Sequence, residues 1–322
     1  MLSYVLAMLA GLALLTAGGE ALIRSALGLA ERLHLSPLLV GLVIVGFGTS
    51  APELAVSVDA ALRGSPDLAT GNVVGSNISN VLLILGLCAV ITPLTITPQG
   101  LRRDAVVALV ASAAIGGLMA TGRTLGVAEA VLLIAALATY LAGAYYTESR
   151  GNQVAAAAIH REQAEAKAAH PRSWFIILGG LLGGLAVLIA GSRVLLWGAI
   201  GIARGAGLSE ALIGLTLVAV GTSLPELTVS LLAAIRRQAG IAVGNILGSN
   251  IFNSLGILGA AGLFGPLAVA ERILAVDQWV MHVATLALLV CLASGYRLNR
   301  LEGASLLTAY AVYVSASALL VG

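Results

Sequence analysis

The stretch GFGTSAPELAVSVD at residues 46–59 returns as AVGTSLPELTVSLL at residues 219–232. Each copy is followed by a second shared block, GNVVGSNISN at 71–80 and GNILGSNIFN at 244–253, and the offset is 173 residues throughout. Residues 36–86 align without a gap to residues 209–259, with 28 of 51 positions identical. A duplicated polar motif that carries a glutamate, in an apolar chain, is typical of secondary transporters built from internal repeats.

The composition predicts an integral membrane protein. The chain is 59% hydrophobic and only 10% charged, with a mean hydropathy of +1.01, whereas soluble domains carry about a quarter charged residues. Apolar runs of about 20 residues suit membrane helices better than barrel strands. The net charge of +2 and the lack of a basic cluster exclude nucleic acid as a partner. Cys88 and Cys291 lie in apolar runs without metal-ligand spacing, so we expect them to pack as apolar side chains.

The apolar segments predict an all-α membrane protein of ten transmembrane helices in two inverted five-helix repeats. Five segments precede the polar linker 147–172 and five follow it, so the repeats 1–146 and 173–322 enter the membrane from opposite sides. The linker favours helix until Pro171, and no Lys or Arg precedes Arg24, which favours a first membrane helix over a cleaved signal. The predicted segments are 2–30, 38–62, 68–92, 104–121, 125–146, 173–203, 210–235, 241–264, 275–294 and 302–320.

The basic residues predict the orientation. Eleven Lys and Arg residues lie at the linker side of these segments and four at the other side. The positive-inside rule therefore places the linker in the cytoplasm and both termini outside. We interpret the linker as a solvated connector, and contact of Arg161, Lys167 and Arg172 with anionic lipid heads is the alternative.

Two glutamates are the residues most indicative of chemistry. Glu53 and Glu226 lie near the middle of apolar segments, where a carboxylate costs several kcal/mol unless it is paired or ligated. Each follows a proline, which removes an N–H and displaces the carbonyl four residues earlier, here Gly48 and Gly221. We therefore expect breaks in helices 2 and 7 that free backbone oxygens. Two carboxylates at matching depth would repel one another without a cation between them.

The neighbouring residues supply further hard oxygen donors. Hydroxyl, amide and carbonyl oxygens suit Na⁺, Ca²⁺ and Mg²⁺ rather than Zn²⁺ or Cu²⁺. In the second block, Ser76 and Asn80 are four residues apart and share one helix face, and the same holds in the second copy. Asn77 and its counterpart Asn250 lie elsewhere on the helix wheel. For any single Ser or Asn, packing between membrane helices is the alternative.

Four charged residues other than the two glutamates carry weaker signals. Glu20 and Arg193 occupy equivalent repeat positions with opposite signs, and either gating or a location near the membrane interface fits them. Asp59 has no counterpart, because position 232 is Leu, and an access vestibule is one interpretation. Asp67 fits the first turn of a helix.

These motifs resemble the α-repeats of the Na⁺/Ca²⁺ exchanger family, in the cation/Ca²⁺ exchanger superfamily, prokaryotic type. The resemblance rests on GTSAPE at 48–53, GTSLPE at 221–226 and the two GSNxxN blocks, and it covers nearly the whole chain. It implies a plasma (inner) membrane location, a cation cluster between helices 2, 3, 7 and 8, and helices 1 and 6 that slide as a unit. The implied ligands are Thr49, Ser50, Glu53, Ser76, Asn80, Thr222, Ser223, Glu226, Ser249 and Asn253, with backbone carbonyls of Gly46 and Ala219.

The same resemblance indicates how the centre differs within the superfamily. In some members, including the K⁺-dependent branch, an Asp occupies the position of Asn80 or Asn253. Here both are Asn, so the centre has two carboxylates, which argues against K⁺ dependence.

Two carboxylates predict an antiport mechanism. One Ca²⁺ or two Na⁺ neutralise a charge of −2. The loaded site can therefore change its access from one side of the membrane to the other, and the empty site cannot. A H⁺/Ca²⁺ antiporter that protonates the same glutamates is the alternative. A channel is a further alternative, and its flux would need no counter-ion. The sequence contains no Ser–His dyad and no metal-binding His pair at membrane depth that would predict an intramembrane enzyme. We expect Ca²⁺ and Na⁺ as substrates, with no cofactor, no catalytic residue and no obligate protein partner.

Overall fold

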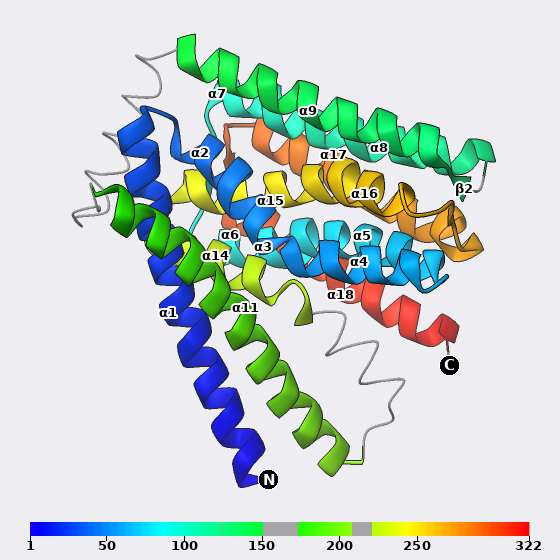
Figure 1. Cartoon of the computed structure of the whole chain (residues 1–322), viewed down its shortest axis with the longest axis horizontal. Coiled ribbons are helices and arrows are strands. Elements are labelled where there is room, and N and C mark those ends of the chain that lie inside the picture. Colours follow the sequence, from blue (N-terminus) through cyan, green and yellow to red (C-terminus); the bar gives the residue numbers. More distant parts are fainter. Residues whose placement is uncertain (123, 151–172, 208–220, 322) are drawn as a thin grey trace.

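A computed structural model of the chain describes residues 1–122, 124–150, 173–207 and 221–321, and most of these residues are helical (Figure 1). In the first half the elements, with η for π-helical turns, are α1 Leu2–Leu33, α2 Pro37–Val40, η1 Gly41–Gly46, α3 Phe47–Thr49, α4 Ala51–Leu62, α5 Pro66–Ser79, η2 Asn80–Leu85, α6 Gly86–Ile91, β1 Leu94–Thr95, α7 Pro98–Gly100, η3 Leu101–Ala105, α8 Val106–Gly122, β2 Thr124–Leu125 and α9 Val127–Arg150. In the second half they are α11 Trp174–Gly205, α14 Leu224–Ile235, α15 Ala239–Ile251, η5 Phe252–Ile257, α16 Leu258–Gly262, β3 Leu267–Ala268, η6 Ile273–Asp277, α17 Gln278–Ala293, β4 Arg297–Leu298 and α18 Arg300–Val321.

Within the described ranges, six helices are long and apolar enough to cross a membrane, or seven if one bent pair counts as a span. The bent pair consists of Pro37–Thr49 and Ala51–Leu62, which meet at 45°. α8 and α18 also occupy predicted segments, and α14 covers the second part of the predicted segment 210–235. The first part of that segment, and most of the linker 147–172, lie outside the described residues. Ten membrane helices therefore remain a prediction.

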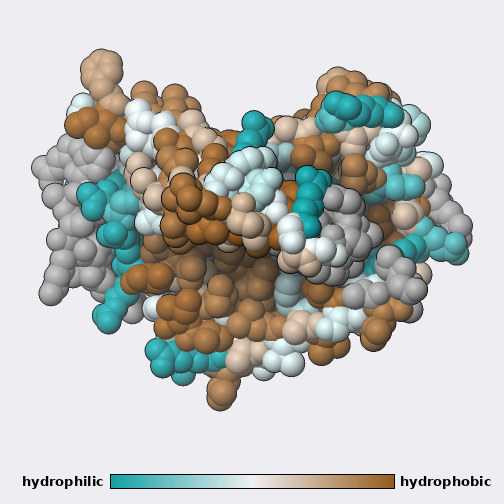
Figure 2. All heavy atoms as spheres, turned by 90° about the horizontal axis from the view of Figure 1, so that it is seen from below, coloured by the Kyte–Doolittle hydropathy of each residue, from teal (hydrophilic) through white to brown (hydrophobic). Residues whose placement is uncertain are grey.

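The exterior of the protein is suited to lipid. Large apolar side chains are exposed on several helices, for example Leu132, Phe175 and Leu301. Apolar residues cover much of the face in Figure 2, with a hollow near its centre. Water would disfavour such a surface, whereas a bilayer accommodates it.

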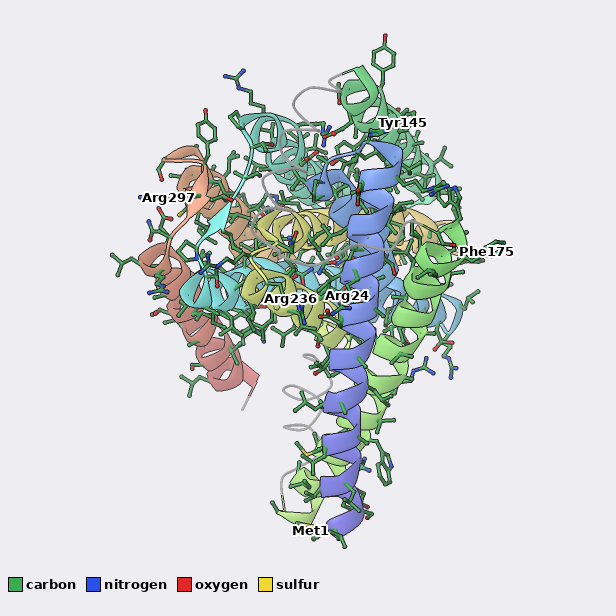
Figure 3. All side chains as sticks on the ribbon, turned by 90° about the vertical axis from the view of Figure 1, so that its left-hand side faces the viewer. Met1, Arg24, Tyr145, Phe175, Arg236 and Arg297 are labelled. Atoms are coloured by element: carbon green, nitrogen blue, oxygen red, sulfur yellow. The ribbon has the colours of Figure 1, made fainter. Side chains whose placement is uncertain are left out.

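α1 and α11 form a tightly packed pair that extends beyond the other helices (Figures 1 and 3). Glycines line their contact on both sides. A Cβ added at Gly18 would lie 2.7 Å from the backbone nitrogen of Leu188, and one at Gly184 would lie 2.9 Å from the carbonyl oxygen of Gly18. Small residues of this kind let membrane helices approach backbone to backbone.

Two short strand pairs join the halves of the chain, and they are related by the 173-residue offset. β1 pairs with β4 through Leu94 and Leu298, and β3 pairs with β2 through the corresponding Leu267 and Leu125. Both pairs are antiparallel. The duplication in the sequence is therefore also a duplication of contacts.

The chain leaves helical geometry immediately before each glutamate-bearing helix. Ser50 has φ −80° and ψ 6°, and Ser223 has φ −88° and ψ 9°. A proline then occupies the first turn of α4 and of α14, where its missing N–H costs nothing. Glu53 and Glu226 therefore lie in the first turns of α4 and α14.

Candidate cation-binding site

The two glutamates lie buried and are held by serines from the opposite repeat. Glu53 and Glu226 are each 1% exposed. The Ser223 hydroxyl donates to Glu53 Oε1 at 3.3 Å, and the Ser50 hydroxyl donates to Glu226 Oε1 at 3.0 Å. These crossed hydrogen bonds bring the two helix breaks together. The second carboxylate oxygen of each glutamate, Oε2, has no hydrogen-bond donor among the described residues.

Two amides complete the buried oxygen set. Asn80 Nδ2 donates to Asn250 Oδ1 at 2.9 Å, and Asn253 Nδ2 donates to Asn77 Oδ1 at 3.1 Å. Because each amide nitrogen is engaged in this way, the oxygens of Asn80 and Asn253 face elsewhere. Neither oxygen receives a hydrogen bond from the described part of the chain.

Asn77 and Asn250 position these amides. Each also bridges the two repeats, since Asn77 Nδ2 donates to the carbonyl of Asn250 at 3.5 Å and Asn250 Nδ2 donates to the carbonyl of Asn77 at 3.3 Å. Sequence analysis placed these residues away from the ligand face and gave them no role. The available signal was that both are identical in the two copies of the motif.

Asn72 and Asn245 hydrogen-bond to the glutamate-bearing helices α4 and α14. Asn245 Nδ2 donates to the carbonyl of Glu226 at 3.2 Å and to Ser230 Oγ at 2.8 Å. Asn72 makes the corresponding bonds to the carbonyl of Glu53 at 3.2 Å and to Ser57 Oγ at 3.0 Å. The sequence placed Asn72 and Asn245 one turn before the predicted ligands and predicted that they are buried or line a cavity, which the structure confirms, but it gave them no role.

The Gly46 carbonyl is surrounded by predicted ligand residues. Ser249 Oγ donates to it at 3.1 Å and Thr49 Oγ1 at 3.3 Å. A Cβ at Gly46 would lie 2.8 Å from the carbonyl oxygen of Asn245, so glycine is required for this approach. Of the remaining predicted ligands, Ser76 and Thr222 face a cavity described below, and Ala219 lies outside the described residues.

The resulting donor set fits a hard cation. Four of the predicted ligands each carry a buried oxygen that receives no hydrogen bond from the described residues: Glu53 Oε2, Glu226 Oε2, Asn80 Oδ1 and Asn253 Oδ1. Leaving such groups unsatisfied costs about 1–3 kcal/mol each, more when charged. Within the described ranges no group of three or more His, Cys, Asp or Glu side chains could hold a metal ion. A cation here would therefore depend on the two carboxylates together with amide, hydroxyl and carbonyl oxygens, which suit Na⁺ and Ca²⁺.

A cavity of about 490 Å³ reaches the site from one side. Its walls come from α4, α5, η6 and α18, and it extends from Arg272 and Asp277 to Asn72, Ser76 and Thr222. The residues at the equivalent positions of the other repeat are closed off: Thr49, Asp104, Asn245 and Ser249 are 0% exposed. Among the described residues, the cavity thus reaches the site from the side of α4, α5 and α18 (the open side), and the equivalent residues on the other side (the closed side) are buried.

Two features distinguish the closed side from the open side. Phe252 stacks on Phe47 with ring centroids 4.3 Å apart, whereas its counterpart Ser79 lines the open cavity. The apolar rings therefore fill, on the closed side, space that corresponds to cavity on the open side.

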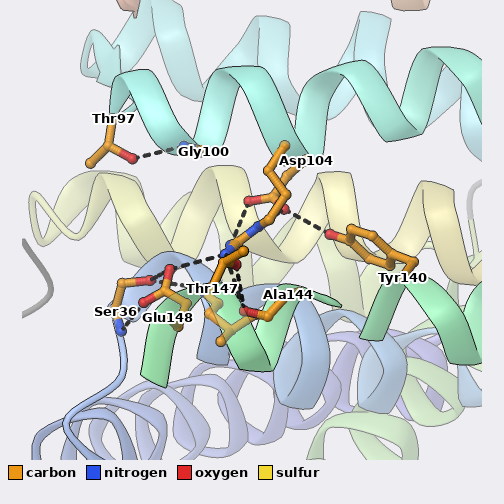
Figure 4. A network of polar contacts seen from close by, with 10 residues as sticks. Ser36, Thr97, Gly100, Asp104, Tyr140, Ala144, Thr147 and Glu148 are labelled. Carbon is orange, nitrogen blue, oxygen red and sulfur yellow. Dashed lines mark hydrogen bonds and ion pairs between the residues drawn. The ribbon is translucent and has the colours of Figure 1, made fainter. Parts of the chain in front are cut away.

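The second feature is a buried polar network (Figure 4). Arg103 pairs with Asp104 at 2.6 Å and with Glu148 at 3.3 Å, and Tyr140 donates to Asp104 at 2.8 Å. Glu148 in turn accepts hydrogen bonds from the backbone N–H and hydroxyl of Ser36, at 3.2 and 2.9 Å. The network fastens the beginning of α2 to η3 and α9.

The structure also shows where the other charged residues named from the sequence lie. Asp59 is exposed and pairs with Arg63 at 2.8 Å, and Glu20 pairs with Arg24 and Arg236. Arg193 is exposed and makes no ion pair with a described residue. Asp67 lies in the first turn of α5, as its position in the sequence predicted.

Comparison with known proteins identifies the family. The sequence model described as sodium/calcium exchanger protein matches residues 3–146 and again residues 176–319. The chain belongs to the sodium/calcium exchanger family. Its similarity to the sodium/calcium exchanger MaX1 of Methanosarcina acetivorans is 34% identity over 339 residues, covering 96% of this chain and 97% of the relative. The inner membrane protein YrbG of Escherichia coli is 32% identical over 281 residues, covering 87% and 85%.

A solved structure shares the fold of this exchanger family member. The sodium-calcium exchanger NCX_Mj, soaked with zero Na⁺ and Ca²⁺, superposes with a TM-score of 0.84 at 28% identity, covering 98% of this chain and 99% of that one. The resemblance inferred from the repeated motifs is thereby confirmed. The protein is a helical membrane transporter of the cation/Ca²⁺ exchanger type.

Proposed function

We propose that this protein exchanges Na⁺ for Ca²⁺ across the membrane by alternating access, with Glu53 and Glu226 as ligands shared by both ions. The observation that carries the proposal is the set of four buried oxygens that no described donor satisfies, two from the glutamates and two from Asn80 and Asn253. The predicted ligands Ser50 and Ser223 also contact these carboxylates. A relative named sodium/calcium exchanger supports the choice of ions.

Charge explains why the ions must exchange. One Ca²⁺ neutralises the two carboxylates, and so do two Na⁺, whereas the empty site leaves two charges buried in a medium of low dielectric constant. Because both ions need the same ligands, binding of one opposes binding of the other. A third Na⁺, held by carbonyls and hydroxyls near Gly46, would make the cycle electrogenic.

The proposed architecture is ten membrane helices in two inverted repeats, residues 1–146 and 173–322, with breaks in helices 2 and 7. The twice-matched family model and the two strand pairs support it, because both follow the same 173-residue offset. The excess of basic residues on the linker side supports a cytoplasmic linker and external termini. The open cavity is lined by Arg272, which lies on the side of the membrane opposite the linker. The cavity would then face outward.

Alternating access would follow from a slide of α1 and α11. Their glycine-lined contact makes them a stiff unit, and Ser192 of α11 donates to the Gly221 carbonyl at the helix 7 break. Movement of this pair would cover one end of the site as it uncovers the other. The plasma membrane of a prokaryote is the proposed location, in keeping with the name of the relative YrbG.

The test is calcium uptake into Na⁺-loaded liposomes that contain the purified protein. Uptake should require an outward Na⁺ gradient and should fall to background in Glu53→Gln and Glu226→Gln. Asp67→Asn is the matched control, because this carboxylate lies exposed at the start of α5. Uptake that continues at the full rate in Glu53→Gln contradicts the proposal.

The same liposomes distinguish the rival H⁺/Ca²⁺ antiporter. Uptake that ignores Na⁺ and follows an imposed pH gradient would assign the protein to proton coupling, with the two glutamates as proton carriers. Flux that needs neither gradient nor counter-ion would indicate a channel.

A further inference from the structure

Four charged residues outside the cation site occupy positions related by the repeat. Arg63 ends α4 and Arg236 ends α14, and these positions are equivalent. Glu20 on α1 is equivalent to Arg193 on α11. Arg63 and Arg236 therefore carry the same charge at equivalent positions, whereas Glu20 and Arg193 carry opposite charges.

In this structure only one of the two locations contains an ion pair between helices. Glu20 lies 2.6 Å from Arg236 at the end of α14 and 2.5 Å from Arg24 on its own helix, and Figure 3 shows the two arginines beside α1. At the other location Arg63 pairs with Asp59, four residues earlier in α4, and Arg193 stays exposed. One carboxylate thus connects α1 to α14, and no described ion pair connects α11 to α4.

The apolar contacts differ in the same way. Gly19 of α1 lies against Leu232 of α14, since a Cβ at Gly19 would be 2.8 Å from Leu232 Cδ1. The counterparts of these two residues are Ser192 and Asp59. Ser192 instead donates to Gly221, so α11 has not taken up the equivalent position on α4.

We propose that α1 and α11 exchange one ion-pair cluster for the other when they slide, so that Glu20 leaves Arg236 as Arg193 meets Asp59. The inference rests on the proposed alternating access. Because Glu20 contacts Arg236 here, the repeat places their counterparts Arg193 and Arg63 together in the other state, and these two residues carry like charges. Asp59 lies on the same helix face as Arg63 and replaces Leu232, so it supplies the missing carboxylate.

Each end state then has one carboxylate between two arginines. Glu20 holds Arg24 and Arg236 in the state seen here, and Asp59 holds Arg63 and Arg193 in the other. In between, Glu20 keeps only Arg24 and Asp59 keeps only Arg63. Glu20, Asp59, Arg193 and Arg236 are therefore positioning residues that favour the two end states over intermediate ones.

Cross-linking tests the geometry. In full-length protein carrying Cys88→Ala and Cys291→Ala, one variant adds Glu20→Cys with Arg236→Cys, and another adds Asp59→Cys with Arg193→Cys. A bifunctional methanethiosulfonate is used, because it reaches further than a direct disulfide. Both variants should cross-link in liposomes, and each cross-link should stop calcium uptake until it is reduced. Cross-linking of the first pair alone, with uptake intact in the uncross-linked protein, overturns the proposed ion-pair exchange and leaves the transport function standing.

A second measurement tests the charges of Glu20 and Arg193 through the accessibility of the open cavity. Ser317, at the cavity wall, is changed to Cys in the same background, and its labelling by a membrane-impermeant thiol reagent reports the open cavity. Loss of an exposed pair changes an equilibrium by about two- to fivefold. Arg193→Gln should speed labelling and Glu20→Gln should slow it by such factors. Arg24→Gln is the control, because Arg24 moves with Glu20 and pairs with it in both states.

The outcomes separate the two proposals. Opposite shifts in Arg193→Gln and Glu20→Gln support the ion-pair exchange even if uptake proves to follow protons rather than Na⁺. Shifts in the same direction, or none in either variant, overturn it whatever the coupling ion is.

Discussion

Replacing Asn77 by Ala tests whether the amides of the site are held in a defined orientation. Asn77 Oδ1 is the acceptor for Asn253 Nδ2, and the Asn77 amide also donates to Ser254 Oγ at 2.9 Å. In Asn77→Ala, the Asn253 nitrogen is left buried without a partner, and the Asn253 amide can turn so that nitrogen rather than oxygen faces the cation. An unsatisfied buried donor costs about 1–3 kcal/mol.

A cation that binds the Asn253 oxygen must turn this amide back, and its binding free energy then bears this cost. We therefore expect the apparent calcium affinity to fall about 5- to 150-fold, since every 1.4 kcal/mol is about tenfold. The affinity is measured from the calcium dependence of uptake in Na⁺-loaded liposomes, and thermal unfolding in detergent is followed in parallel.

Matched variants show whether the effect belongs to the amide. Asn250→Ala removes the equivalent acceptor of Asn80 and should weaken binding to a similar extent. Ser254→Ala removes one bond to Asn77 but leaves the Asn253 amide in place, so its affinity should stay near that of the native protein. A lower melting temperature in Asn77→Ala with unchanged calcium affinity would refute the reasoning and make Asn77 a packing residue.

Three further predictions concern packing and closure. Gly18→Ala introduces a Cβ 2.7 Å from the backbone of Leu188 and should lower the unfolding free energy by about 1–3 kcal/mol in thermal denaturation, whereas Gly179→Ala, with no atom within 4 Å, should not. Phe252→Ser removes the ring that stacks on Phe47 and should expose the closed side, so that a cysteine at Thr49 is labelled faster by a thiol reagent; no change in labelling would show that the ring does not close this path. Glu148→Gln should weaken the buried network and destabilise the protein by about 1.5–3 kcal/mol, because the charged hydrogen bonds of Glu148 are lost while Asp104 still pairs with Arg103; an unchanged melting temperature contradicts this.

The sequence drew attention to the two glutamates, which the structure places in the interior, but not to the residues that hold them. Glu53 and Glu226 are readable because a carboxylate in an apolar run has few explanations. The braces Asn72 and Asn245 are equally duplicated, but an amide in a membrane helix is common packing material, and only the fold shows that it bonds to a glutamate carbonyl.

The crossed serine bonds were not predictable either. Sequence spacing assigns Ser50 and Glu53 to one helix break, yet Ser50 donates to the glutamate of the other repeat. Periodicity describes faces of one helix and says nothing about which break lies opposite. The open and closed sides could not be predicted for a related reason, because Ser79 against Phe252 is one of several differences between the two copies and nothing in the sequence singles it out.

The crossed bonds have a consequence for how such a chain can arise. Either half contains a glutamate and a serine, but each serine serves the carboxylate of the other half. Under the proposed inverted arrangement, a half-length ancestor would have formed this site only as a homodimer whose two copies were inserted in opposite orientations. After fusion of the two copies, one sequence no longer had to insert into the membrane in both orientations, and the two copies could diverge. The differences between them, Ser79 against Phe252 and Asp59 against Leu232, are changes that a symmetric homodimer had no means to make on one side alone.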